Sequence, residues 1–188
     1  MDVFKAIKNR RSTRAFTNEP VSDKEVEKLI DAARCAPSAG NIQPWEFIVI
    51  RDPKIKKRIA QAALDQTFIE EAPVVIIVCA STSRSSRGYG SRGMNLYCLQ
   101  DTAAATQNIL LAAHALGLAT CWVGAFREDE TQKVVNLPND IRPVAIIPVG
   151  HPRQISKMPA RRTMNEITHH ETFERAIEKS KVKRAEDN

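Results

Sequence analysis

One segment, APVVIIVCA at residues 72–80, constrains the fold more than any other part of the sequence. Its apolar residues run continuously and are rich in valine and isoleucine, instead of alternating with polar residues. A strand of this kind is typically buried on both faces. WEFIVI at 45–50 and PVAIIPVG at 143–150 predict two further strands. We therefore expect a central sheet with helices on both of its sides.

Helix start signals predict the elements of these covering layers. Ser22 and Glu25 form a capping box in front of a run of helical periodicity. Asp52 is followed by Pro53, which is the usual order of an N-cap and a proline at the first helical position. The ranges expected to be helical are 2–10, 23–35, a segment starting at 53, about 95–116, and about 128–136.

The expected helix at 95–116 carries apolar or small residues nearly all the way round, including 103–105 and 109–113. Gly117 is placed to end it as a C-cap. A helix with so little polar surface is normally buried. In a chain of 188 residues, the simplest cover for such a helix is a second copy of the same chain.

The length and composition predict one domain, residues 1–188, with a C-terminal arm from about 151. A net charge of +6 permits an acidic partner such as nucleic acid, an anionic membrane or a phosphorylated cofactor. The first residues contain no signal-peptide core, and the longest apolar run is far below the ~18 residues that span a bilayer. We expect a cytoplasmic protein with no membrane segment.

Cysteine and histidine do not indicate a catalytic or metal site. The four cysteines include no C-x-x-C pair and are expected to be reduced and mostly buried. Neither Cys35 nor Cys121 has a local pattern that would activate a thiol nucleophile. His114 lies in an apolar helix and is expected to be a satisfied core histidine. On a helix, the adjacent residues His169 and His170 would point in different directions, so we expect no metal site.

The pattern G-x-G-x-x-G at Gly88, Gly90 and Gly93 fits the dinucleotide-binding fingerprint. In that fingerprint the first glycine follows its strand immediately, whereas here residues 81–87 intervene. The acidic residue expected ~20 positions later is also missing. We interpret residues 81–93 as a flexible polar loop that could serve as a lid.

The RRSTR cluster near the start is a more informative basic motif. Its guanidinium groups and a hydroxyl follow a helix end within five positions and suit the oxygen atoms of a phosphate. A solvated basic turn is the alternative, and a second basic pair further along the chain favours the anion site. The residues concerned are Arg10, Arg11, Ser12 and Arg14, with Arg161 and Arg162 as the second pair.

The loop PSAGNIQPW at 37–45 separates an expected helix from an expected strand. Its two prolines and its glycine exclude regular structure through its middle, while Ser38, Asn41 and Gln43 supply polar groups. RRSTRAF, APSAGNIQPWEFIVI, QDTAAATQNILLAAHALGLATCWVGAF and IRPVAIIPVGHP follow one another in the sequence. In this order they resemble the flavin-dependent nitroreductase family, over about residues 1–173.

The resemblance implies an α+β fold of three layers, with a central, mainly antiparallel sheet flanked by helices, in an intertwined homodimer. It also implies that flavin mononucleotide (FMN) binds at the dimer interface in sites built from both subunits. Arginines would hold the phosphate and the pyrimidine end of the ring, and backbone N–H groups would point toward flavin N5. The implied contacts are Arg10, Arg11, Ser12, Arg14, Gln66, Val123, Gly124, Arg161 and Arg162 from one subunit, and Pro37, Ser38, Ala39, Asn41 and Gln43 from its partner.

The activity implied is that of an FMN-dependent oxidoreductase. NADH or NADPH would deliver hydride to flavin N5 and leave, after which a nitroaromatic or quinone would take the electrons in the same pocket, a ping-pong reaction. The flavin performs the hydride transfer, so no catalytic acid or base is expected. Alternatives are a flavin-binding protein without turnover and a dehalogenating or flavin-consuming member of the same fold. A nucleic-acid binder is disfavoured because no recognition-helix pattern accompanies the basic residues.

Overall fold

Four strands form one sheet in the first of the two compact units into which the chain divides. The computed structural model describes residues 1–154 and 157–173; the first unit is Met1–Lys157 and the second begins at Met158. The strands are β1 (Trp45–Ile50), β2 (Val74–Ser81), β3 (Ala119–Thr120) and β4 (Ile141–Gly150), in the order β1-β2-β4-β3. Each neighbouring pair is antiparallel, as expected.

The central pair of strands, β2 and β4, carries most of the sheet. Val74 of β2 faces Val149 of β4, and the pairing continues to Ser81 opposite Ile141. A register shift between Val78 and Cys79 places a bulge in this ladder. Every residue of β2 is buried, which confirms that the continuous apolar run is covered on both faces.

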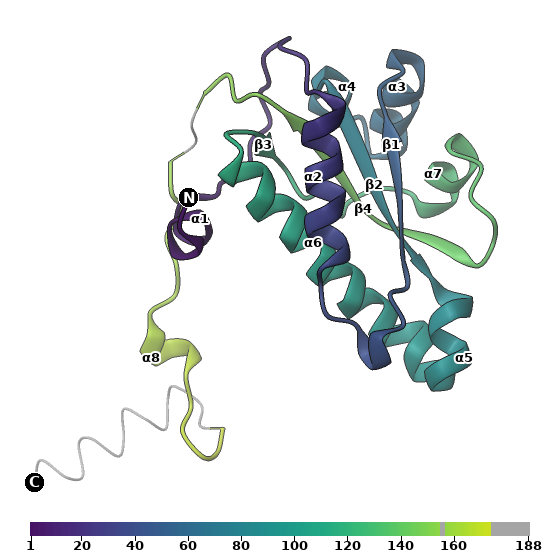
Figure 1. Ribbon diagram of the computed structural model, residues 1–188, viewed down its shortest axis with the longest axis vertical. Helices are drawn as coiled ribbons and strands as arrows, with labels where there is room; N and C mark the ends of the chain where they lie inside the picture. The colour runs from purple at the N-terminus through teal and green to yellow at the C-terminus, as the bar shows by residue number, and fades with distance from the viewer. Residues whose placement is uncertain (155–156, 174–188) are drawn as a thin grey trace, which may run out of the picture. The chain divides into compact units, whose positions relative to one another are not determined.

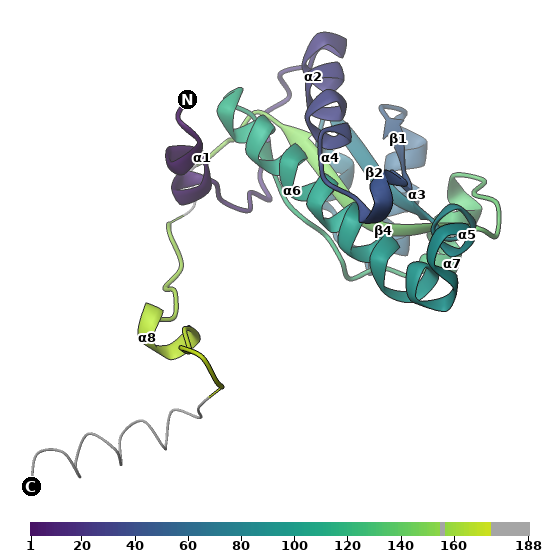
Figure 2. The same ribbon diagram turned by 60° about the horizontal axis from the view of Figure 1, so that its bottom comes forward.

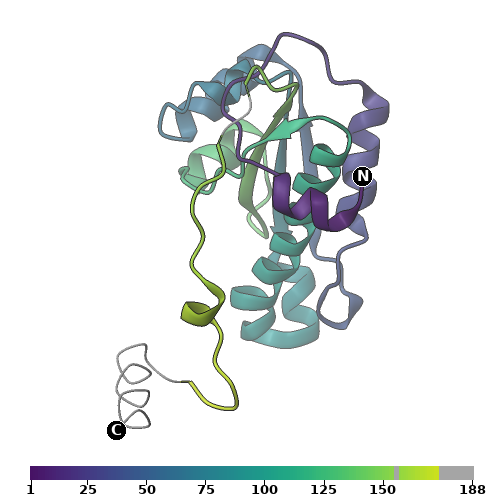
Figure 3. The same cartoon turned by 90° about the vertical axis from the view of Figure 1, so that its left-hand side faces the viewer.

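Alternate residues of β2 enter different cores, because side chains of a strand point to opposite faces. Val74, Ile76 and Val78 pack in one apolar cluster with residues of α2 (Asp23–Arg34) and α6 (Cys98–Ala115). Val75 and Ile77 enter a second cluster, whose helical residues come from α3 (Pro53–Ala62), α4 (Phe68–Glu71) and α7 (Glu128–Val134). Figure 1 and Figure 3 show the sheet between these two helical layers.

The helix start signals act as the sequence predicts. The hydroxyl of Ser22 accepts the backbone N–H of Glu25, and the Glu25 carboxylate accepts the backbone N–H of Ser22 at 2.8 Å. The Asp52 carboxylate accepts the backbone N–H groups of Lys54 and Ile55 at 2.8 and 3.0 Å. These bonds satisfy N–H groups that the first turn of each helix leaves without intrahelical partners.

The polar loop expected at 81–93 is helical, so this prediction is wrong. The residues form α5 (Thr82–Arg92), which has non-helical angles at Tyr89 and Gly90, and then a short π-helix, η2 (Gly93–Tyr97). Ser81 caps α5 by accepting the backbone N–H of Arg84. This role was not predicted, because a segment rich in serine is also typical of a loop.

Two glycines of this segment, Gly88 and Gly93, lie close to neighbouring residues. A Cβ at Gly88 would collide with the Ile42 side chain, and one at Gly93 would collide with the Ser85 carbonyl oxygen. At Gly93 the obstacle is backbone, so only a residue without a side chain fits there, whereas at Gly88 the obstacle is the flexible end of the Ile42 side chain. This agrees with rejecting the dinucleotide fingerprint at Gly88, Gly90 and Gly93.

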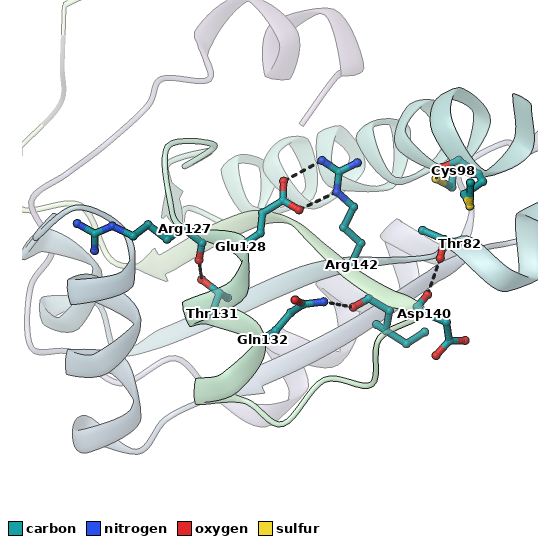
Figure 4. Close-up of polar contacts among 10 residues, drawn as sticks. Thr82, Cys98, Arg127, Glu128, Thr131, Gln132, Asp140 and Arg142 are labelled. Carbon is teal, nitrogen blue, oxygen red and sulfur yellow. Dashed lines mark hydrogen bonds and ion pairs between the residues drawn. The ribbon is translucent and has the colours of Figure 1, made fainter. Parts of the chain in front are cut away.

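Polar contacts join α7 to β4 and β4 to the start of α5 (Figure 4). Arg142 of β4 donates from Nε and Nη2 to the two carboxylate oxygens of Glu128, both at 2.8 Å. Thr82 donates its hydroxyl to the backbone carbonyl of Asp140 at 2.9 Å. The α5 segment is therefore fixed to the body at its first residue.

Two helices expose much of their apolar surface. In α1 (Val3–Asn9), Val3, Phe4 and Ile7 are 56%, 76% and 55% exposed. In the second unit, α8 (Met164–Ile167) has both of its terminal apolar side chains exposed. Along α6, Leu99, Ala103 and Leu111 are half-buried rather than buried. Exposed apolar side chains that cluster in this way are typical of surfaces that contact another molecule.

The described residues also show the state of the cysteines, whether metal-ligating side chains cluster, and whether any helix could cross a membrane. All four cysteines are free thiols; Cys35 is exposed and the other three are buried. No group of three or more metal-ligating side chains gathers within residues 1–154 and 157–173. In the same residues, no helix combines the length and apolar character needed to cross a membrane.

Candidate functional site

The N-terminal motif lies against β3 at the C-terminal end of α6. The backbone N–H of Thr13 donates to the Thr120 carbonyl at 2.9 Å, and Ser12 forms a parallel bridge with Thr120. Leu118, just before β3, donates its N–H to the Ala113 carbonyl in the last turn of α6. The exposed Ser12 is therefore held beside the segment that continues to 123–124.

Arg14 and Gln66 belong to the same neighbourhood. The Arg14 guanidinium carbon lies 5.7 Å from the centre of the Phe68 ring, which is a cation–π distance. Gln66, two residues before Phe68, donates its side-chain amide to the carbonyls of Ala63 and Ala125 at 2.8 and 3.0 Å. These contacts connect the exposed Arg14 to the turn that follows Gly124.

Only one of the two backbone donors expected at 123–124 is available. The N–H of Val123 donates to the Ile146 carbonyl at 3.0 Å and so belongs to the sheet. This corrects the expectation for Val123, because a backbone N–H already paired in a buried ladder is a poor donor to a ligand. Gly124 is exposed, and a Cβ there would meet no atom within 4 Å. Gly124 remains the candidate donor.

Arg10 and Arg11 line a hollow of about 250 Å³ between α1, the end of α6 and β3. The Arg11 guanidinium donates to the carbonyls of Lys8 and Arg10 at 2.7 and 2.8 Å and so caps the end of α1. His114 lines the same hollow, and burial lowers its pKa, so the imidazole is neutral at neutral pH. Its buried Nε2 has no partner among the described residues, so the expected satisfied core histidine is only partly correct.

The loop at 37–43 has an unusual backbone. Gly40, Asn41 and Gln43 have φ angles of 55°, 56° and 52°, the left-handed region that non-glycine residues rarely adopt. The side-chain amide of Gln43 donates to the side-chain oxygen of Asn41 at 3.1 Å, and the backbone N–H of Gln43 donates to the Ser38 hydroxyl at 3.0 Å. Such strain persists only where surrounding contacts enforce it, and it is typical of functional loops.

This loop lies at the other end of α6. The backbone N–H of Ala39 donates to the Asp101 carboxylate, in the first turn of α6, at 3.1 Å. Figure 1 and Figure 2 show α5 at this end of α6, and α1 beside the opposite end. With 18 residues, α6 is about 27 Å long. Within the first unit, the N-terminal motif and the 37–43 loop therefore lie far apart.

The two arginines of the second basic pair, Arg161 and Arg162, belong to the second unit. Both side chains are exposed and precede α8, whose start is capped reciprocally by Thr163 and Glu166. Their contact with a flavin phosphate stays a prediction.

The positive charges of Arg10 and Arg14 near Cys121 favour a bound anion. The burial of Cys121 disfavours thiol chemistry. Cys121 lies directly between Thr120 and the 123–124 turn and is 1% exposed. Burial raises the pKa of this thiol, although the neighbouring Arg14 and Arg10 act in the opposite direction. A buried thiol with a raised pKa stays protonated at neutral pH, so it is not a nucleophile.

Sequence reasoning missed the two side chains that anchor the 37–43 loop. Asp101 accepts the N–H of Ala39, and Arg84 of α5 donates to the Gln43 carbonyl at 2.7 Å. Ala39 and Asp101 are 62 positions apart in the sequence, and Gln43 and Arg84 are 41 positions apart, so no local pattern reveals these contacts. The available signal was an aspartate inside an otherwise apolar helix.

Comparisons with known proteins identify the family. The profile described as "Nitroreductase family" matches residues 7–71 and 64–151. A Methanothermobacter thermautotrophicus protein, provisionally described as an NADH dehydrogenase/NAD(P)H nitroreductase, is 36% identical over 158 residues, 82% of this chain and 79% of the relative. The chain belongs to the nitroreductase family.

Two further relatives are similar along most of the chain. The Bacillus subtilis protein named FMN reductase [NAD(P)H] is 30% identical over 185 residues, 92% of this chain and 74% of the relative. The structure of B. megaterium NfrA2 superposes with a TM-score of 0.88 at 26% identity, and covers 95% of this chain and 78% of its own. The α+β fold with its antiparallel sheet is the nitroreductase fold.

Proposed function

We propose that this chain uses NADH or NADPH to reduce nitroaromatic or quinone-type acceptors through FMN bound at the candidate site described above. The broader part of this statement follows from family membership: the chain is an FMN-dependent NAD(P)H oxidoreductase. The observation that carries the proposal is a set of contacts: Thr13, next to Ser12, bonds to Thr120 of β3, Arg14 lies over the Phe68 ring, and Gln66 bonds to Ala125, the neighbour of Gly124.

We also propose that the active form is a homodimer. The loop at 37–43 and the N-terminal motif are separated by the length of α6, so one chain cannot supply both halves of a site. A second chain can bring its loop to the N-terminal motif of the first. The exposed apolar residues of α1 and the half-buried stripe of α6 provide the surface that such a partner would cover.

The residues of the first half fit FMN. Arginine side chains suit the phosphate because their planar guanidinium groups donate paired hydrogen bonds to its oxygens. The open space beside Gly124 lets a flat ring approach the backbone, since no side chain of the described chain fills it. Within residues 1–154, no acidic side chain lines the hollow beside Arg10 and Arg11, so no carboxylate from this part of the chain repels an anion there.

When bound, the flavin supplies hydride acceptance at N5 and passes the electrons on to the second substrate. The chain supplies orientation and charge. Arg14 would place a fixed positive charge near the pyrimidine end of the ring, where negative charge accumulates on reduction. The Gly124 N–H would be available as a donor near the ring, and Arg10 and Arg11 would hold the phosphate. The protonated thiol of Cys121 takes no part in proton transfer.

A visible absorption spectrum of the purified protein with added FMN tests the cofactor first. We expect a bound yellow flavin that bleaches under anaerobic NADH or NADPH and recovers when a quinone or nitroaromatic is added. Retained flavin that neither nucleotide reduces would support a binding protein without turnover. If supplied FMN did not bind, the assignment would fail.

Steady-state kinetics then test the order of events and the acceptor. A ping-pong reaction gives parallel double-reciprocal lines when one substrate is varied at several fixed concentrations of the other. Intersecting lines would mean that both substrates must be bound together and would refute the ping-pong proposal. Free FMN belongs in the acceptor panel, because the B. subtilis relative is named an FMN reductase. Faster turnover with free FMN would redirect the proposal to flavin reduction.

A further inference from the structure

The loop at 37–43 is held from both ends by charged side chains of other elements. At its start, the Asp101 carboxylate of α6 accepts the backbone N–H of Ala39 at 3.1 Å. At its end, the Arg84 guanidinium of α5 donates to the Gln43 carbonyl at 2.7 Å and also pairs with Glu46 of β1. These are the charged contacts that reach the loop from other helices among the described residues.

Asp101 is a charged residue that is almost fully buried in α6. It is 7% exposed, and its Oδ2 is buried without a hydrogen-bond partner in the described chain. Burying a carboxylate is costly unless it is paired, and the hydrogen bond that it accepts through Oδ1 leads to the loop. Burial also raises the pKa of this carboxyl, against the opposing effect of the Ala39 N–H. The fold therefore retains a costly acceptor at the point where it meets the loop.

The loop needs such restraint because its backbone conformation is unfavourable. Asn41 and Gln43 both adopt positive φ without being glycine, and each such residue carries a conformational cost. The bonds inside the loop, Asn41 N–H to the Ser38 carbonyl and Gln43 N–H to the Ser38 hydroxyl, do not tie it to the body. Asp101 and Arg84 connect the loop to α6 and α5.

We propose that Asp101 and Arg84 are positioning residues, which fix the 37–43 loop in the conformation that completes the partner subunit's flavin site. The proposal rests on the proposed function, because it takes this loop to be the second half of that site. Neither side chain needs to touch the flavin. Each acts through the backbone of the loop.

Amide hydrogen exchange in the flavin-free protein tests the proposal directly. The informative amides are Asn41 and Gln43, because neither bonds to Asp101 or Arg84, so their exchange reports the conformation of the loop. In Asp101→Ala and in Arg84→Ala we expect these amides to exchange about tenfold faster, because each variant loses a charge-assisted bond. FMN binding, measured by titration, should weaken by about the same factor.

Matched controls separate positioning from general destabilisation. Thr106→Ala truncates another buried polar side chain of α6, whose hydroxyl bonds only within the helix to the Thr102 carbonyl. Arg87→Ala removes an exposed arginine of α5. Both should leave loop exchange and FMN affinity near wild type. Asp101→Asn keeps an oxygen that can accept the Ala39 N–H and should restore both quantities.

Loop amides that exchange at wild-type rates in both Asp101→Ala and Arg84→Ala would overturn the proposal. An equal effect of Thr106→Ala, or an Asp101→Asn variant as impaired as Asp101→Ala, would overturn it too. Arg84 is half-exposed, so Arg84→Ala decides the matter if Asp101→Ala does not fold. A wild-type protein that binds no FMN would refute the proposed function, whereas loop exchange in the flavin-free protein still tests the anchoring.

Discussion

Replacing Gly124 by valine should separate flavin binding from folding. A Cβ at this position meets no atom within 4 Å in the chain, so the flavin-free protein should keep its stability to within about 0.5 kcal/mol. If the flavin ring lies against this backbone, the added side chain must displace it. Overpacking of this kind costs about 1 to 3 kcal/mol, which corresponds to FMN binding weaker by a factor of about 5 to 150.

The assay is a fluorescence titration of the flavin-free protein with FMN, together with a thermal melt of the same sample. Gly150→Ala is the matched control, because a Cβ there would meet Pro73 Cδ at 2.7 Å and Phe16 Cδ1 at 3.0 Å inside the core. We expect this control to lower the melting temperature and, well below that temperature, to bind FMN normally. Wild-type FMN affinity in Gly124→Val would refute the placement of the ring beside Gly124.

Three further predictions concern stability. Asp52→Ala removes the N-cap of α3 and should cost about 1 kcal/mol in urea unfolding; an unchanged midpoint would contradict the capping role. Glu128→Gln breaks the half-exposed pair with Arg142 and should cost at most about 1 kcal/mol, less at high salt; a loss that salt leaves unchanged would contradict this. Because burial raises the pKa of Asp101, protonation of this carboxyl favours the folded state, and this contribution is lost as the pH rises through the raised pKa. The melting temperature of Asp101→Asn relative to wild type should therefore fall as the pH is lowered from about 7 to about 4; a difference independent of pH would refute the reasoning.

Local signals made much of the fold predictable. The uninterrupted apolar run of β2 could only be a strand covered on both faces, and the structure divides its side chains between two cores. The capping box of α2 and the aspartate–proline start of α3 have fixed geometry within three or four residues. Such patterns are reliable because the residues that form the contact are neighbours in the sequence.

The α5 segment shows where local signals fail. Serine, arginine and glycine are all compatible with loops, so the composition predicted a loop. The helix is fixed at its first residue by a distant group, the Asp140 carbonyl that accepts the Thr82 hydroxyl, and Gly88 allows close approach to Ile42. Tertiary contacts here override local preference.

The candidate site was predictable in its residue types and less so in its details. The ordered motifs indicate which segments meet a flavin, but they cannot show that the Val123 N–H is already used by Ile146. They also cannot show Asp101 or Arg84 at the loop, because these contacts join residues far apart in sequence. Long-range contacts of this kind become visible only when the chain is folded.

The length of α6 has a genetic consequence. In a symmetric dimer, each site would combine the N-terminal motif of one subunit with the 37–43 loop of the other. A subunit inactivated at Arg14 and a subunit inactivated at Asn41 would each be dead as homodimers. In a mixed dimer, both lesions would fall in one site and the other site would be intact. Co-expression of two inactive alleles should therefore restore activity, by interallelic complementation, to about half of the wild-type level per mixed dimer.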